Sequence, residues 1–205
     1  MMESCRGIVL VGGKSARMGQ DKALLPWGER VLATWMAERV QAVCGSTYLV
    51  GSAAKYSGLG FPVIEDVFAG QGPLGGIHAG IQSSPARWNL VVGCDLPYLT
   101  AEFLTWLLQL AKSEQSDVTI PESEMHGYEP LCAVYAGGCL HPIEEALRSG
   151  KRKIRQVLER LAVRVVRVEE WKRYDPEGKL FRNVNTAEEY QRARTELLAC
   201  EQIAE

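Results

Sequence analysis

The sequence predicts a three-layer α/β fold, in which a mainly parallel twisted sheet carries helices on both faces. Short β-branched apolar runs alternate with longer stretches whose apolar residues recur at helical spacing. The run 88–93 is apolar except for Asn89, as expected of a central strand that is covered on both faces. The first apolar run, 8–11, ends at the glycine pair Gly12 and Gly13, a pattern typical of a strand that leads into a ligand-binding turn.

The elements follow from local patterns along the chain. We expect strands at 8–11, 47–50, 61–64, 88–93, 118–121, 131–135 and 163–168. We expect helices at 32–43, 72–80 and 151–161, and after Thr100 and Thr186. Gly45 should end the first helix, Thr100 should cap its helix, and Thr186 with Glu189 matches a capping box. The sequence contains no repeat, low-complexity tract or linker, so we predict a single domain over 1–205.

Composition excludes several classes of protein. The chain has 23 Lys and Arg against 25 Asp and Glu, so no basic field favours a nucleic-acid partner. No apolar run approaches the ~20 residues of a membrane helix, and the first residues do not resemble a secretory signal. The six cysteines have no metal-type spacing. We therefore expect a cytoplasmic protein with free thiols.

The loop after the first strand carries the strongest functional signal. It combines two glycines with Lys14, Arg17, Gly19 and Lys22, a set suited to a polyanion such as a nucleotide triphosphate. The loop lacks both the Gly-x-Gly-x-x-Gly pattern of dehydrogenases and the Gly-Lys-[Ser/Thr] ending of a P-loop. The alternative is a tight turn with exposed lysines, which leaves the combination of arginine, glycine and lysine unexplained.

Two aspartates also follow predicted strands. Because ligands of open α/β sheets bind beyond the carboxyl ends of the strands, Gly12, Asp66 and Asp95 should face one crevice. Asp95 suits Mg²⁺, which takes one or two carboxylates together with phosphate oxygens. Its alternative role as a helix cap is already filled by Thr100. Asp66 could join the metal, hold a ribose or simply end its strand.

Other charged and titratable residues are less informative. His78, His126 and His141 are single residues without metal spacing, and we predict no catalytic role for them. The basic stretch 151–155 could bind a substrate phosphate or form a solvated helix face.

Four motifs together resemble the molybdenum cofactor guanylyltransferases, the MobA family. They are Leu-Val-Gly-Gly-Lys-Ser-Ala-Arg-Met-Gly-Gln-Asp-Lys at 10–22, Gly-Pro-Leu-Gly-Gly-Ile at 72–77, Cys-Asp-Leu-Pro at 94–97 and Asn-Val-Asn-Thr at 183–186. The resemblance extends from about residue 7 to 190 and implies a Rossmann-like nucleotidyltransferase fold. The first motif fits many nucleotidyltransferases, whereas the glycine pair and the closing motif favour the guanylyl branch.

The resemblance implies transfer of GMP from GTP to molybdenum-molybdopterin, with release of pyrophosphate. It implies GTP contacts from Leu10, Val11, Gly12, Lys22, Asp66 and Asp95, with Mg²⁺ on Asp95. In-line attack by the pterin phosphate needs no general base, and Arg17, Lys22 and Asp95 would act on the reacting phosphates. Asn183, Asn185, Arg152 and Lys153 are the candidate contacts for molybdopterin.

The chain departs from the family at two places. It reads Val-Gly-Ser-Ala-Ala at 50–54, where relatives often offer an asparagine, so Ser52 would replace that contact. Val11 stands where alanine is usual, a change that leaves backbone contacts intact. Alternative functions are a cytidylyltransferase of the same cofactor, another nucleotidyltransferase, or a nucleotide-binding module without turnover. Transient contact with other proteins of molybdenum cofactor biosynthesis is also expected.

Overall fold

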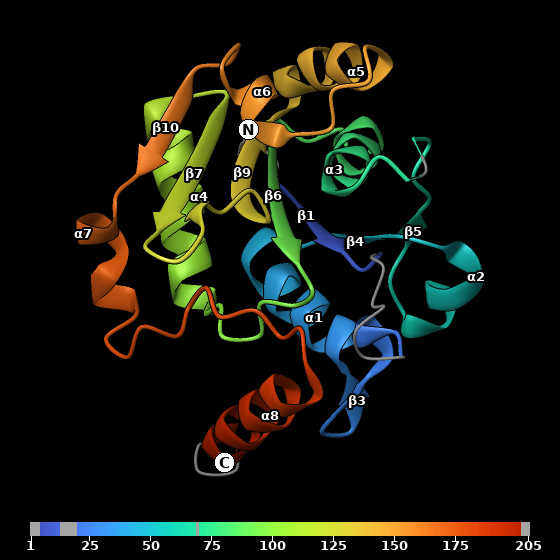
Figure 1. The fold of residues 1–205 in the computed structure, drawn as a ribbon, viewed down its shortest axis with the longest axis vertical. Coiled ribbons are helices and arrows are strands. Elements are labelled where there is room, and N and C mark those ends of the chain that lie inside the picture. Colours follow the sequence, from blue (N-terminus) through green and yellow to red (C-terminus); the bar gives the residue numbers. More distant parts are fainter. Residues whose placement is uncertain (1–4, 13–19, 69, 202–205) are drawn as a thin grey trace.

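Eight of the strands in the described part of the chain form one twisted sheet. The computed structural model describes residues 5–12, 20–68 and 70–201 (Figure 1). The strands in this part of the chain are β1 (Cys5–Leu10), β2 (Pro26–Trp27), β3 (Arg30–Val31), β4 (Thr47–Val50), β5 (Val63–Ile64), β6 (Trp88–Gly93), β7 (Val118–Ser123), β8 (Gly127–Tyr128), β9 (Cys132–Ala136) and β10 (Val163–Val166). The sheet order is β10-β7-β9-β6-β1-β4-β5, with β8 beside β7, while β2 and β3 form a separate hairpin.

Most neighbouring strands of the sheet run parallel. β1 pairs in parallel with β4 and β6, β4 with β5, and β7 with β10. β9 runs antiparallel to both β6 and β7. Every residue of β6 is buried, which confirms the expectation of a central covered strand. The predicted fold class is confirmed, with β9 and the short β8, which pairs with β7, as the antiparallel strands.

Helices connect these strands. Their bounds are α1 (Leu32–Cys44), α2 (Ala53–Tyr56), α3 (Pro73–Gln82), α4 (Ala101–Glu114), α5 (Leu140–Arg148), α6 (Ile154–Leu158), α7 (Val168–Trp171) and α8 (Ala187–Glu201). α1 ends at Gly45, whose φ of 76° is left-handed. The Thr100 hydroxyl accepts from the N–H of Phe103 at 3.2 Å, and Thr186 and Glu189 form the predicted capping box.

Three predicted elements are markedly shorter in the structure than expected. The strand predicted at 61–64 is confined to β5, and the one predicted at 163–168 ends at Val166. β10 ends at Val166 because a helix starts directly after it. The carboxylate of Glu170 accepts the N–H of Arg167 at 2.8 Å, and α7 begins at Val168. The helix predicted over 151–161 is the short α6 alone.

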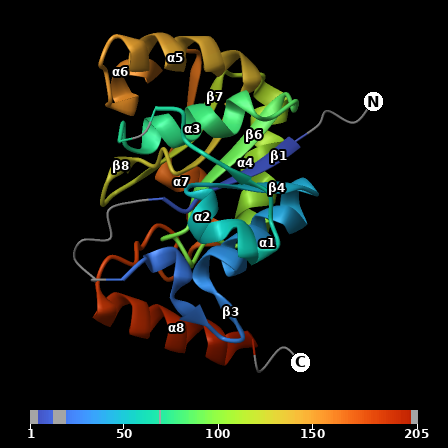
Figure 2. The same cartoon turned by 90° about the vertical axis from the view of Figure 1, so that its right-hand side faces the viewer.

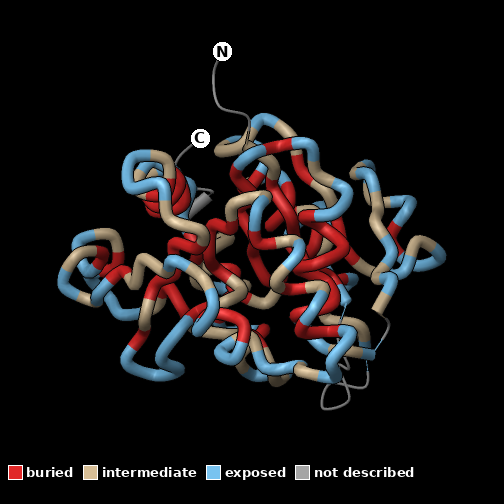
Figure 3. Tube along the Cα trace, turned by 90° about the horizontal axis from the view of Figure 1, so that it is seen from above, coloured by how far each residue is buried: buried red, intermediate tan, exposed pale blue. Residues whose placement is uncertain are grey.

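Alternate residues of the central strands face opposite helical layers. Val9 packs in one apolar cluster with α1 and α4, whereas Ile8 packs in a second cluster with α3 and α5. Figure 2 shows α3 and α5 on one side of the sheet and α1 and α8 on the other. In Figure 3 the buried stretches run through the middle of the molecule. This two-sided burial is the physical basis of the three layers.

The α3 layer lies very close to the sheet. A Cβ atom at Gly80 would lie 2.6 Å from Cγ2 of Ile8, so only glycine fits at this contact. At Gly76, nearer the beginning of the helix, a Cβ atom would lie 3.2 Å from Cδ2 of Leu10, so α3 is also close to the end of β1.

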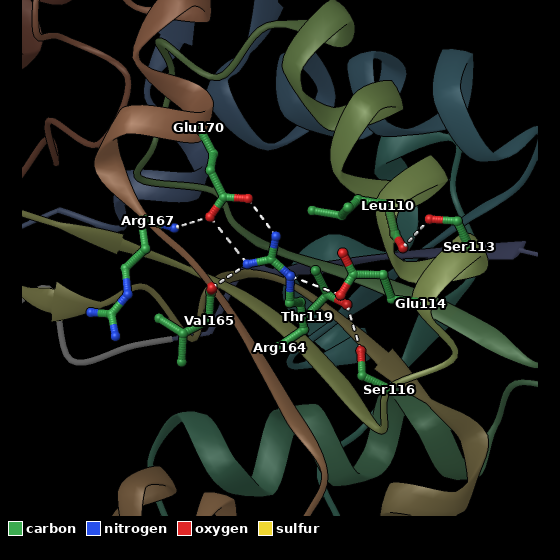
Figure 4. Close-up of polar contacts among 9 residues, drawn as sticks. All are labelled: Leu110, Ser113, Glu114, Ser116, Thr119, Arg164, Val165, Arg167 and Glu170. Carbon is green, nitrogen blue, oxygen red and sulfur yellow. Dashed lines mark hydrogen bonds and ion pairs between the residues drawn. The ribbon is translucent and has the colours of Figure 1, made fainter.

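Arg164 links β10 to two helices (Figure 4). Its Nε donates to Glu114 of α4 at 2.8 Å, and its Nη1 donates to Glu170 of α7 at 3.1 Å. The hydrogen bonds with Glu170 and Glu114 raise the pKa of Arg164, whereas burial opposes this shift. This network anchors the edge strand that lies farthest from β1 and β4. None of the helices in the described ranges is long and apolar enough to cross a membrane.

Candidate active site

A cleft of about 840 Å³ opens at the carboxyl ends of β1, β4, β5 and β6. Parallel strands place these ends at one edge of the sheet, as the sequence analysis expected. The lining residues are 10–12, 21–23, 50–52, 65–66 and 93–95, with Gly70, Gly72, Pro73, Gly76 and Leu131. Gly12, Asp66 and Asp95 therefore face the same space.

The turn after β1 forms the floor of the cleft. The N–H of Val11 donates to the carbonyl of Val50 at 3.0 Å, and the carbonyl of Leu10 accepts from Cys94 at 3.1 Å. These bonds extend the β1 ladder to both neighbouring segments, while Gly12 is exposed. A ligand can thus approach the main chain of Gly12 without meeting a Cβ atom.

Lys22 joins two distant segments across the cleft. Its ammonium donates to Oδ2 of Asp95 at 3.1 Å and to Oδ1 of Asn185 at 3.0 Å. Lys22 begins a short 3₁₀ turn, Lys22–Leu24, in which Asp21 caps the N–H of Ala23 at 3.2 Å. The capped turn holds the base of the lysine side chain, and the two oxygens orient its charged end.

Asp95 lies two residues after the end of β6 and lines the cleft. Its Oδ1 would lie 2.7 Å from a Cβ atom at Gly93, so the glycine leaves the space that this carboxylate occupies. Its carbonyl accepts from the N–H of Val184 at 2.9 Å, which ties the 183–185 segment to the same turn. Thr100 caps α4, so Asp95 is not the helix cap.

Asp66 follows β5, and its side chain lies beside the first turn of α3. Its Oδ1 accepts the N–H of Phe68 at 2.8 Å, and its Oδ2 would lie 2.6 Å from a Cβ atom at Gly75. Gly72, with φ of 70°, makes the turn that starts this helix. The positive end of α3 favours a carboxylate there. Asp66 therefore shapes the turn after β5 and also lines the cleft.

Charge in the described lining is predominantly negative. It contains four carboxylates and one lysine, namely Asp21, Glu65, Asp66, Asp95 and Lys22. All four carboxylates accept hydrogen bonds within the protein: besides the bonds of Asp66 and Asp95 described above, Glu65 accepts the N–H of Ala53 at 3.0 Å and Asp21 accepts from Lys55 at 3.1 Å. A polyanion in this space needs further positive charge near Asp95.

The remaining predicted residues lie in different places. Arg17, with Lys14 of the same loop, lies outside the described residues. Asn185 is brought to Lys22, and Asn183 is half-buried two positions earlier without lining the cleft. Arg152 and Lys153 are exposed in the segment before α6 and do not line the cleft.

Tyr56 supports the cleft although no pattern in the sequence predicts it. Its hydroxyl lies 2.9 Å from the carbonyl of Val11 and 2.8 Å from Oδ2 of Asp21, with both oxygens accepting. Burial, followed by the hydrogen bond to Asp21, raises the pKa of Tyr56, so the hydroxyl stays protonated at neutral pH. No local pattern predicts a bond that spans 45 positions, although the aspartate before Lys22 could have been recognised as a cap.

None of the three histidines is among the described lining residues of this cleft, and the expectation that none of them is catalytic stays a prediction. His78 is buried on α3, and His126 pairs with Glu129 at 3.0 Å beside the turn between β7 and β8. Within the described ranges, no cluster of three or more His, Cys, Asp or Glu side chains could hold a metal ion by itself. A cation at Asp95 would thus complete its coordination with ligand oxygens and water.

Comparisons with known proteins agree with this geometry. The family described as the MobA-like NTP transferase domain matches residues 7–165. A probable molybdenum cofactor guanylyltransferase of Pelotomaculum thermopropionicum is 35% identical over 94% of this chain and 93% of its own. A molybdenum cofactor guanylyltransferase of Desulfosudis oleivorans is 32% identical over 97% and 98% of the two chains.

Solved structures share the fold. Molybdopterin-guanine dinucleotide biosynthesis protein A of Archaeoglobus fulgidus superposes with a TM-score of 0.82 at 29% identity, covering 95% of this chain and 99% of that one. A CMP:2-keto-3-deoxy-manno-octonic acid synthetase bound to CTP has a TM-score of 0.73 at 11% identity, covering 97% and 99%, which is a likeness of fold alone. With the family match covering most of its length, the chain belongs to the MobA-like NTP transferase family.

Proposed function

We propose that this protein transfers GMP from GTP to molybdenum-molybdopterin and releases pyrophosphate. The observation that carries this proposal is the meeting of Lys22, Asp95 and Asn185 beside the glycine turn after β1. The names of the similar proteins supply the two substrates, and the cleft supplies groups suited to a nucleotide and its reacting phosphates.

The nucleotide would lie across the turn at 10–12. Backbone groups of Leu10, Val11 and Gly12 would contact the guanine nucleotide, with Asp66 on the nucleoside side. Lys22 would meet the phosphates, because its ammonium already lies beside Asp95 within the cleft. Arg17 would add positive charge from the same loop, and Ser52 lines the cleft next to the turn after β4.

The acceptor would approach from the side of the 183–185 segment. Asn183 and Asn185 are the proposed molybdopterin contacts, and the bond between Val184 and Asp95 holds this segment at the strand ends. Arg152 and Lys153 remain predicted contacts that lie outside the described cleft lining. The terminal phosphate of the pterin would attack the α-phosphorus of GTP in line, while pyrophosphate leaves on the opposite side.

This reaction requires few catalytic groups from the protein. The attacking phosphate is already ionised, so the chain needs no general base. Its tasks are to position two anions and to stabilise the charge that develops on the phosphate oxygens. Lys22 suits the second task because Asp95 and Asn185 orient its ammonium before the reaction.

We further propose Mg²⁺ as the cofactor, held by Asp95. The donor set fits, since Mg²⁺ is commonly bound by one or two carboxylates together with substrate phosphates and water. The excess of carboxylates over lysine in the described lining also favours a cation with the nucleotide. When bound, the ion would neutralise phosphate charge and act as a Lewis acid.

The decisive experiment measures pyrophosphate release with each of the four NTPs, with and without molybdenum-loaded molybdopterin. The proposal expects release that requires both GTP and the loaded pterin. Preference for CTP would support a cytidylyltransferase, and release with a different acceptor would support another nucleotidyltransferase. GTP binding without release under all conditions would support a binding module.

Two further proposals concern where the protein acts in the cell and which proteins it contacts. We expect the protein to act in the cytoplasm, and to contact other proteins of molybdenum cofactor biosynthesis transiently, because the proposed acceptor is a product of that biosynthesis. Cell fractionation with detection of the protein in the cytoplasmic or membrane fraction would test the first proposal.

A further inference from the structure

Two cysteines meet at the end of the sheet opposite to the cleft. Cys5 is the first residue of β1 and Cys44 is the last residue of α1. Their sulfur atoms lie 3.0 Å apart although the residues are 39 positions apart in the chain. A disulfide needs about 2.05 Å between sulfurs, so closing this pair requires a movement of about 1 Å.

Strand pairing brings the two residues together. β1 and β4 are parallel with Gly7 opposite Thr47, and the N–H of Gly7 also donates to the carbonyl of Ser46 at 2.9 Å. Cys5 lies two residues before Gly7 on β1. Cys44 lies two residues before Ser46, at the end of α1. The backbone hydrogen bonds of the sheet therefore hold the sulfurs in contact.

The surroundings favour reaction at Cys5. The hydrogen bond with Cys44 lowers the pKa of the Cys5 thiol, and the charges of Lys112 and Arg6 lower it further, against an opposing effect of burial. The same hydrogen bond and burial raise the pKa of Cys44. Cys5 is thus the better nucleophile, and Cys44 is the neighbouring thiol that can resolve a mixed disulfide.

The other described cysteines lack this arrangement. Cys94, Cys132 and Cys139 are buried, whereas Cys5 and Cys44 are both partly exposed. Burial raises the pKa of each of these three thiols. Reagents in solution should therefore reach the Cys5–Cys44 pair selectively among these five residues.

We propose that Cys5 and Cys44 are a redox-reactive dithiol, which a low-molecular-weight disulfide such as oxidised glutathione converts into an internal disulfide. The Cys5 thiolate attacks one sulfur of the reagent and expels one glutathione thiolate. That thiolate takes the proton of Cys44, whose sulfur then attacks Cys5 and releases the second glutathione as a thiolate. Two protein thiols are oxidised, and one small disulfide is reduced to two thiols.

The crosslink should stabilise the fold without closing the cleft. It would join the start of β1 to the end of α1, and the closed segment would include the glycine turn and Lys22. The cleft lies at the other end of β1, about 17 Å away for a six-residue strand. Nucleotide binding should therefore continue in the crosslinked protein, while Tm rises by about 10 °C.

The test treats the reduced full-length protein with oxidised glutathione, removes the reagent and maps peptides by mass spectrometry. We expect one Cys5–Cys44 link, the higher Tm, and reversal of both by a thiol reductant. The Cys44→Ser variant should instead retain one glutathione on Cys5. As a matched control, Cys200→Ser should still form the link.

Three results would overturn the inference. They are a stable glutathione adduct on Cys5 in the unmodified sequence, a preferred link to any other cysteine, and a Cys5–Cys44 link that leaves Tm unchanged. These readouts use no transfer assay, so they stand apart from the proposed function. If the Cys44→Ser variant does not fold, the peptide map of the unmodified sequence still decides the question.

Discussion

The ammonium nitrogen of Lys22 lies 3.1 Å from Oδ2 of Asp95, although 73 positions separate the two residues in the chain. One residue follows the glycine loop after β1 and the other follows β6, and the parallel register of β1 and β6 brings the ends of both strands to one edge. The pair is oriented further by Asn185. Under the proposed function, a lysine held in this way would meet a phosphate with little rearrangement.

The substitution Asp95→Asn should lower the rate of pyrophosphate release by at least about 100-fold, because it removes the negative charge but keeps the size of the side chain. The melting curve by circular dichroism should stay close to that of the unmodified protein. Glu102→Gln is a suitable control, since it removes a similar charge from the exposed first turn of α4. Full turnover in Asp95→Asn would refute the metal assignment.

The substitution Lys22→Ala should weaken GTP binding by about 10- to 100-fold, the range expected for loss of a charge-assisted hydrogen bond. Guanosine carries no phosphate, so its affinity should change much less. Isothermal titration of both ligands in both proteins measures the difference. Equal losses for GTP and guanosine would show that Lys22 does not act through the phosphates.

Those two residues show what the sequence could predict. The position of Asp95 at the cleft can be predicted because a carboxylate shortly after a strand that is apolar except for one residue indicates the ligand edge of an α/β sheet. Asn185 was proposed as a pterin contact through the family resemblance, but its hydrogen bond to Lys22 spans 163 positions. That bond depends on the path of 175–186 along the strand ends, which no local periodicity describes.

Other features depended on tertiary packing in the same way. The apolar pattern of β9 predicted a strand but not its antiparallel direction, because strand direction leaves no mark in residue alternation. The basic stretch before α6 allowed either a phosphate site or a solvated face. Arg152 and Lys153 are exposed in the structure, and their predicted contact with molybdopterin remains to be tested.

His78 should make stability depend on pH. It is 1% exposed, it packs edge-to-face on Phe68, and neither ring nitrogen has a hydrogen-bond partner among the described residues. Burial lowers the pKa of His78, although the carboxylates of Glu144 and Asp66 act in the opposite direction and Arg148 adds to the lowering. The folded protein therefore keeps this ring neutral where the unfolded chain would protonate it.

The sign of the pH effect follows from proton binding. Below about pH 6.5 the unfolded chain binds a proton at His78 that the folded protein excludes, so stability falls as pH falls. The loss is up to about 1.4 kcal/mol for each pH unit. Urea unfolding at pH 7.5, 6.0 and 5.0 should show a steeper decline for the unmodified protein than for His78→Leu. Parallel curves would contradict this account of His78.

The contact between Gly80 and Ile8 should make α3 intolerant of even one added methyl group. A Cβ atom at position 80 would lie 2.6 Å from Cγ2 and 2.8 Å from Cδ1 of Ile8. We expect Gly80→Ala to lower the free energy of unfolding by about 1–3 kcal/mol, despite the higher helix propensity of alanine. Urea denaturation provides the measurement.

A double-mutant cycle isolates this contact from helix propensity. In an Ile8→Ala background the space beside position 80 is open. In that background Gly80→Ala should leave the free energy of unfolding nearly unchanged or raise it. Gly138→Ala serves as the control, because a Cβ at that position meets nothing within 4 Å. If Gly80→Ala lowers the free energy of unfolding equally in both backgrounds, the strain lies elsewhere in α3. Relief in the Ile8→Ala background would show that this close approach of helix to strand limits the size of residue 80.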